Sequence, residues 1–174
     1  MRIAGVLAAI VVALALQSAL ARFAVARGFG LDLVLVVVVF AGLAWGPVAG
    51  LLTGSVAGLA QDAISGGIVG VGGLAKTIVG FFVGAVGSQF IITQAAPRFF
   101  VFFGATVMHA LCFLGLYAVI EARRFGWPWP VVLTQGTANG VLGLLVFKLV
   151  ETLPGVLERR RSGRGSVGKR WTNG

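Results

Sequence analysis

The chain has 174 residues and a net charge of +9, yet 58% of its residues are hydrophobic and only 11% are charged. Soluble domains usually carry about a quarter charged residues, so this composition excludes an ordinary soluble enzyme and also a disordered chain. With a mean hydropathy of +1.00, we expect an all-α polytopic membrane protein. Its 27 glycines indicate helices that pack closely or break. The single Cys112 excludes a disulfide framework.

Six apolar runs follow one another along the chain, separated by glycine, proline or arginine. A helix needs roughly 20 apolar residues to cross a bilayer. The sequence therefore predicts a membrane domain of residues 1–155 with six transmembrane helices, over residues 3–21, 31–45, 47–61, 74–92, 98–121 and 131–152. The first run ends in Ser-Ala-Leu-Ala at residues 18–21, so a cleaved signal peptide is the alternative for that run.

The second and third helices come from one long apolar stretch that Trp45-Gly46-Pro47 interrupts in its middle. Proline lacks an amide donor, and its ring clashes with the preceding turn of a helix. We therefore predict two short helices joined by a tight turn, each about 22 Å long and short for a hydrocarbon layer of roughly 30 Å. One long kinked helix is the alternative.

Residues 156–174 form a tail rich in glycine and basic residues, which we expect to be disordered. Against Glu158 stand six basic residues: Arg159, Arg160, Arg161, Arg164, Lys169 and Arg170. Such a cluster is typical of a cytoplasmic segment on anionic lipid, with a nucleic-acid-binding tail as the alternative. Six helices put both termini on one side, so both should be cytoplasmic. The short loops argue against this orientation, because it leaves outside Arg22, Arg27, Arg123 and Arg124.

Glycines recur every fourth residue in the third predicted helix and at similar spacing in the fourth. The candidate contact residues are Gly50, Gly54, Gly58, Gly80 and Gly84. Small residues at this spacing let helix backbones approach closely, which is what holds membrane helices together. The first interpretation is packing within the chain, and the second is a face that binds a partner.

Two charges extend these glycine ladders. Asp62 follows Gly58 by four residues, and Lys76 lies between Gly72 and Gly80. One short loop joins their helices, so we expect Asp62 and Lys76 to pair just inside the outer interface. The alternative is two separate side chains that each reach to the headgroups.

The last predicted helix carries a narrow polar face with Gln135 and Asn139. Hydrogen bonds between helices are the plainer explanation of this face, and contact with a small molecule or a partner is the other. Lys148 and Glu151, three residues apart, should pair near the cytoplasmic end. The lone His109 is a weak candidate for a proton relay because the sequence places no acid near it.

The sequence lacks a nucleophile–histidine–acid set, paired carboxylates at helical spacing and a cluster of metal ligands. We therefore expect no enzymatic activity, no cofactor and no metal. A proton or ion transporter would also need buried carboxylates that are scarce here.

The order of these features resembles the MreD family of bacterial rod shape-determining membrane proteins. The similarity covers nearly the whole chain, and it rests on a set of short motifs: Asp32-Leu33, Trp45-Gly46-Pro47, Gly50…Gly54…Gly58-Leu59-x-x-Asp62, the glycine-rich stretch to Gly73, Gly80 with Gly84, and Asn139. Lys76 departs from the family's usual pattern, which has a neutral residue there.

The resemblance implies a non-catalytic role in cell elongation and peptidoglycan synthesis, in the inner membrane. The implied partner is MreC, a single-span protein with a periplasmic domain. More loosely, the RodA glycosyltransferase, a penicillin-binding transpeptidase and the MreB filament would be associated. The resemblance also implies the six-helix fold of the substrate-binding components of energy-coupling-factor transporters. The alternative function is therefore a vitamin-binding subunit of such an importer, which would need a pocket with several polar and aromatic groups.

Overall fold

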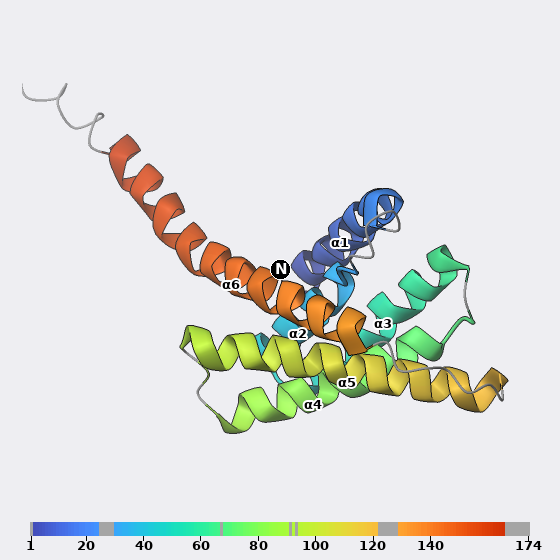
Figure 1. The fold of residues 1–174 in the computed structure, drawn as a ribbon. Coiled ribbons are helices and arrows are strands. Elements are labelled where there is room, and N and C mark those ends of the chain that lie inside the picture. The colour runs from blue at the N-terminus through green and yellow to red at the C-terminus, as the bar shows by residue number, and fades with distance from the viewer. Residues whose placement is uncertain are drawn as a thin grey trace, which may run out of the picture.

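The computed structural model describes residues 2–24, 30–66, 68–90, 92, 94–121 and 129–165. Within these ranges the chain is helical and has no strand (Figure 1). The helices are α1 (Arg2–Ala24), α2 (Leu33–Trp45), α3 (Pro47–Ser65), α4 (Val71–Gln89), α5 (Ala95–Glu121) and α6 (Trp129–Gly165). Of those described, α1, α4, α5 and α6 are long and apolar enough to cross a membrane. The prediction of an all-helical fold is confirmed for the described residues, and four of the six predicted spans have the length and composition of membrane-crossing helices.

The break between α2 and α3 is real. Gly46 has a φ of 90°, which favours glycine, and Pro47 occupies the first turn of α3, where its missing amide costs nothing. The alternative of one long kinked helix is therefore wrong. The two helices fold back on each other, since Val34 and Val38 of α2 share a buried cluster with Ala57 of α3.

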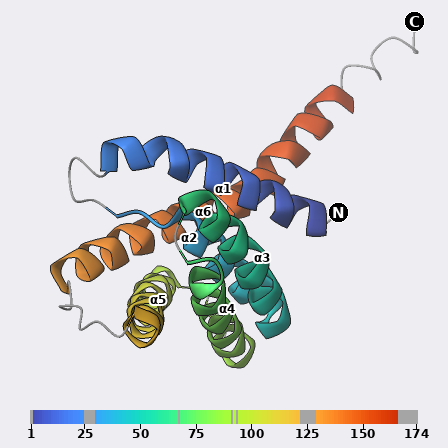
Figure 2. The same ribbon diagram turned by 90° about the vertical axis from the view of Figure 1, so that its right-hand side faces the viewer.

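Helix α2 lies at the centre of the bundle. One apolar cluster joins it to α4 and α5 through Val39, Val79 and Phe102. The other joins it to α1 through Ile10 and Ala13. Figure 2 shows α4 between α3 and α5.

One predicted boundary is wrong. Helix α6 does not end before Pro154 but continues to Gly165. A proline removes one amide donor and bends a helix, whereas the leucine, glutamate and arginines that follow Pro154 are strong helix formers. The prediction of a disordered tail therefore fails for residues 156–165, which include Arg159, Arg160, Arg161 and Arg164. Figure 1 shows this extension projecting away from the other helices. The rest of the tail lies outside the described residues.

Candidate functional site

The closest helix contact is that of α3 with α4, and glycines make it. A methyl group at Gly50 would collide with the carbonyl oxygen of Gly80, and one at Gly54 would collide with that of Lys76. One at Gly58 would come within 2.6 Å of the Cα of Gly73. We call this contact the glycine seam, formed by Gly50, Gly54, Gly58, Gly73, Gly80 and Gly84. The interpretation as packing within the chain is confirmed. Since α4 covers this face of α3, the face is not open to a partner helix, which was the second interpretation.

A buried ion pair lies beside the seam. The Asp32 carboxylate accepts from the Lys76 ammonium with 2.9 Å between Oδ2 and Nζ, and the side chains are 5% and 2% exposed. Helix α2 is about 20 Å long, so it cannot reach both surfaces of a hydrocarbon layer of roughly 30 Å. Buried charges in such a layer are expensive unless they neutralise each other, and this pair does.

Helix α5 adds His109 to the pair. Its Nε2 lies 3.1 Å from the Lys76 Nζ. An ammonium can only donate hydrogen bonds, so Nε2 accepts and the imidazole is neutral, with its proton on Nδ1. The charges of the three groups therefore sum to zero: one negative carboxylate, one positive ammonium and a neutral ring. The sequence near His109 contains no acid, so it did not predict this contact of His109. Asp32 reaches the site from another helix.

Helix α6 completes the cluster through Asn139, whose side chain is buried. Its Oδ1 accepts from the Asp32 backbone amide at 3.2 Å, and its Nδ2 donates to the Thr106 hydroxyl at 3.1 Å. The hydroxyl in turn donates to the Phe102 carbonyl at 2.9 Å. We call Asp32, Lys76, Thr106, His109 and Asn139 the polar cluster. Asn139 therefore makes the hydrogen bonds between helices that its polar face indicated.

The polar cluster also closes the N-terminal end of α2. The first amides of a helix have no partner within it, and in a membrane each unpaired amide is costly. The Asp32 Oδ1 accepts from the Leu35 amide at 2.9 Å, and the Gln17 Oε1 accepts from the Val34 amide at 3.3 Å. The carboxylate also gains from the positive end of the α2 dipole. Side chains of α1, α6 and the capping residue thus replace the water that an exposed helix end would use.

The predicted ion pair of Lys76 and Asp62 does not form. The Asp62 Oδ2 instead accepts from the backbone amides of Gly70 and Gly73, at 2.9 and 3.0 Å. These amides begin α4, whose positive dipole end attracts a carboxylate. Lys76 lies more than one turn further along α4 and points into the bundle. It is 2% exposed, so the alternative of a side chain reaching the headgroups is also wrong for Lys76.

The other predicted pair is also wrong. Glu151 pairs with Arg98 of α5, with 2.6 Å between Oε1 and Nη2. The Arg98 guanidinium also lies 4.5 Å from the centre of the Phe147 ring, and its Nε donates to the Ile92 carbonyl. Contacts between helices thus replaced the expected contact within α6. Gln135 is half-buried near Gly30, where an added methyl would lie 3.6 Å from its side chain.

The polar cluster is suited to structure rather than to reaction. Each of its charged or hydrogen-bonding side chains has a partner in a neighbouring helix. Among the residues that the structure describes, no three histidine, cysteine or acidic side chains form a group that could hold a metal ion. The fold and this site define a helical membrane protein whose intramembrane charges neutralise one another inside the bundle.

The comparisons with known proteins name the family. The family model described as rod shape-determining protein MreD matches residues 2–153, and the chain belongs to the MreD family. The resemblance drawn from the sequence motifs is thereby confirmed. No curated protein and no solved structure matches the chain.

Proposed function

We propose that the chain is a non-catalytic component of the bacterial cell-elongation machinery in the cytoplasmic membrane, where it binds an MreC-like single-span protein. The family match over residues 2–153 carries this proposal. The internally satisfied polar cluster supports it, because its side chains are used to hold four helices together. RodA, the penicillin-binding transpeptidase and MreB would be reached through the partner.

The contact with the partner lies in or near the bilayer. The longest segment between two consecutive helices, residues 25–32, has eight residues, so the connections are too short to reach a periplasmic domain far from the membrane. The glycine seam is covered, which leaves the lipid-facing surfaces of the helices. Of the described long apolar helices, α1 has the smallest buried share, with 11% of its apolar window buried against 17% for α5.

A depletion and purification experiment tests this function. In a rod-shaped bacterium that depends on this chain, depletion should produce round cells. A tagged copy purified from native membranes should bring down a single-span protein with a periplasmic domain. Depleted cells that stay rod-shaped, together with a purified chain that retains no such partner, would refute the proposal.

The alternative function, a vitamin-binding importer subunit, gains no support. Such a subunit needs free polar groups that converge on a pocket. Gln135, Asn139 and His109 were the candidates for these groups, and the last two are occupied within the polar cluster. A fold like that of energy-coupling-factor components remains a prediction, which an experimental structure would test.

A further inference from the structure

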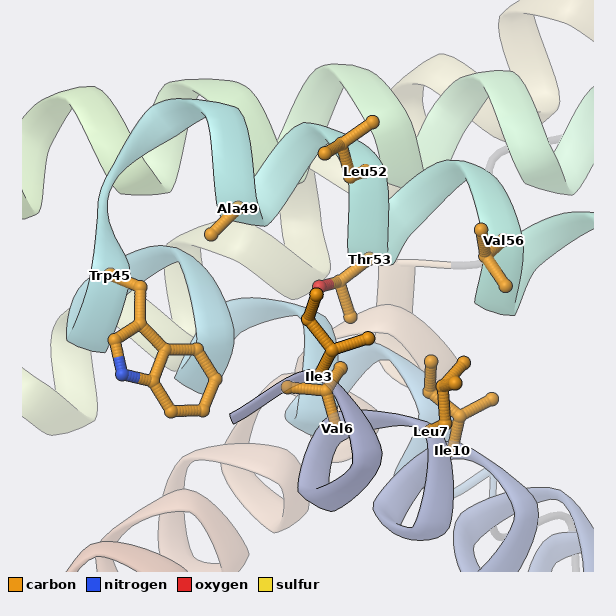
Figure 3. Close-up of a pocket in the computed structure, with 9 residues that line it drawn as sticks. All are labelled: Ile3, Val6, Leu7, Ile10, Trp45, Ala49, Leu52, Thr53 and Val56. Atoms are coloured by element: carbon orange, nitrogen blue, oxygen red, sulfur yellow. The ribbon is translucent and has the colours of Figure 1, made fainter. Parts of the chain in front are cut away.

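Two hollows lie one after the other along the contact between α1 and α3. The first, of about 340 Å³, has walls formed by Ile3, Leu7 and Ile10 of α1 and by Ala49, Leu52 and Val56 of α3. Figure 3 shows the α1 side chains facing α3, with Trp45 at one end of the hollow and Val56 at the other. The Thr53 hydroxyl is its single polar side-chain group apart from the Trp45 indole nitrogen. We call this hollow the apolar cleft.

The second hollow, of about 260 Å³, has a different lining. Four of its residues are polar and uncharged: Gln17 and Ser18 of α1, and Gln61 and Ser65 of α3. We call it the polar pocket. The two hollows follow the same order along both helices, so α1 and α3 run in roughly the same direction. The groove between them changes from apolar to polar toward their C-terminal ends.

Gln61 has a hydrogen-bonding group that the protein leaves unused. Its Oε1 is shielded from solvent and has no hydrogen-bond partner among the described residues. Two of the other polar residues have partners elsewhere, because the Ser18 hydroxyl donates to the Leu14 carbonyl and the Gln17 Oε1 accepts from the Val34 amide of α2. A buried acceptor without a donor is costly, and more so near lipid, where water is scarce. Rotation of the Gln61 amide would present this acceptor to a donor in the pocket.

The size of the groove selects its occupant. A helix is about 10–12 Å wide, so even three turns of one would need roughly 1,000 Å³ or more. The apolar cleft is about a third of that, which fits a hydrocarbon chain. The distances agree, because Ser18 and Leu7 are about 16 Å apart along α1 and one leaflet has roughly 15 Å of hydrocarbon. A lipid with its headgroup at Ser18 thus reaches the apolar cleft with its chain.

We propose that the groove between α1 and α3 binds one membrane glycerolipid with an uncharged, hydroxyl-bearing headgroup, such as diacylglycerol. Its acyl chain lies in the apolar cleft, and its hydroxyl donates to the Gln61 amide in the polar pocket. Among the described residues that line the polar pocket, none has an ionised side chain, so these residues offer no counter-charge to a phosphate. This assignment does not depend on the proposed role in cell elongation.

Photo-crosslinking in nanodiscs tests the proposal. The purified full chain is placed in phosphatidylcholine nanodiscs that contain a trace of photoreactive diacylglycerol or, in parallel, photoreactive phosphatidylcholine. Diacylglycerol should label peptides of α1 and α3 preferentially, whereas phosphatidylcholine should label all lipid-facing helices. Equal labelling of all helices by both probes would overturn the proposal.

Two substitutions with matched controls locate the lipid. Ala49→Phe fills the apolar cleft and should abolish the preferential labelling, whereas Val48→Phe, at a neighbouring lipid-facing position with 67% exposure, should leave it intact. Gln61→Leu should reduce it roughly two- to ten-fold, as loss of one hydrogen bond predicts. Gln94→Leu, at an exposed position outside both hollows, is its control. Labelling that survives both Ala49→Phe and Gln61→Leu would contradict the assignment.

The remaining candidate occupant is a protein helix. Crosslinking in native membranes distinguishes it from a lipid. A photoreactive amino acid at Leu52, on the wall of the apolar cleft, should give a lipid adduct when the full chain is irradiated in native membranes. A protein adduct in place of the lipid would refute the proposal.

Discussion

At the level of single residues, the ion pair of Asp32 and Lys76 makes the sharpest prediction. Asp32→Asn or Lys76→Met alone leaves a buried charge without its partner, and each should destabilise the protein by about 3–5 kcal/mol. The double variant removes both charges and should recover a large part of that loss. Unfolding of the purified protein in detergent, followed as a double-mutant cycle, measures the coupling between the two positions.

A second cycle provides the control. Asp62 caps α4 and does not touch Lys76, so Asp62→Ala, which removes the capping acceptor, should cost about 0.5–2 kcal/mol. Its effect should add to that of Lys76→Met, because the side chains share no hydrogen bond. Strong coupling in this second cycle and none in the first would show that Lys76 uses Asp62 after all.

The sequence identified most members of the polar cluster but not their partners. Lys76, His109 and Asn139 each stood out as a polar residue in an apolar run, whereas Asp32 appeared only in a family motif and Thr106 was not singled out. A lysine buried in a membrane needs an acidic partner, and the sequence offers both Asp32 and Asp62 on nearby helices. The choice depends on how far α4 slides along α3, since one turn of a helix moves a side chain by about 5 Å. Sequence periodicity does not fix that offset.

At the level of helices, the glycine seam predicts where bulk is tolerated. Gly54→Leu would drive a side chain into the α4 backbone at Lys76, so we expect loss of the folded protein rather than loss of the partner alone. Gly104→Leu on α5 is the matched control, because nothing lies within 4 Å of a methyl group at that position. Protein abundance in membranes and melting temperature in detergent compare the two.

If the Gly54→Leu protein accumulates normally but loses its partner, the assignment of Gly54 to the contact of α3 with α4 is contradicted. That pattern would place the partner, not α4, against Gly54.

Helix positions were more predictable than helix ends. The turn at Gly46 and Pro47 followed from backbone chemistry alone, because both residues act locally. The length of α6 did not follow, since a proline can either end a helix or bend it. The short length of α2 is tolerated for a nonlocal reason: side chains of Gln17 and Asn139, far away in the sequence, satisfy its first amides.

At the level of the whole molecule, we predict six crossings with both termini in the cytoplasm. Helix α3 has 19 residues and runs in roughly the same direction as α1. Helix α2, which connects them in the sequence, runs the opposite way. Single cysteines placed in a Cys112→Ser background report the side of each turn. Ala44→Cys should react with a membrane-impermeant thiol reagent only from the cytoplasm, and Ser65→Cys only from outside.

The cytoplasmic end needs a separate measurement. A reporter fused after Gly174 should be active only in the cytoplasm. A reporter active outside, or two cysteines that react from the same side, would reject this arrangement.

The amide cap that Asn139 provides for α2 has a consequence for biosynthesis. Helix α2 leaves the ribosome early, but the side chain that satisfies the Asp32 amide belongs to α6, the last helix to be made. Until α6 arrives, the Asp32 amide lacks this acceptor, and an unpaired amide is costly where water is scarce. We therefore expect a chain truncated before α6 to be less stable, and to accumulate less in membranes, than the full chain.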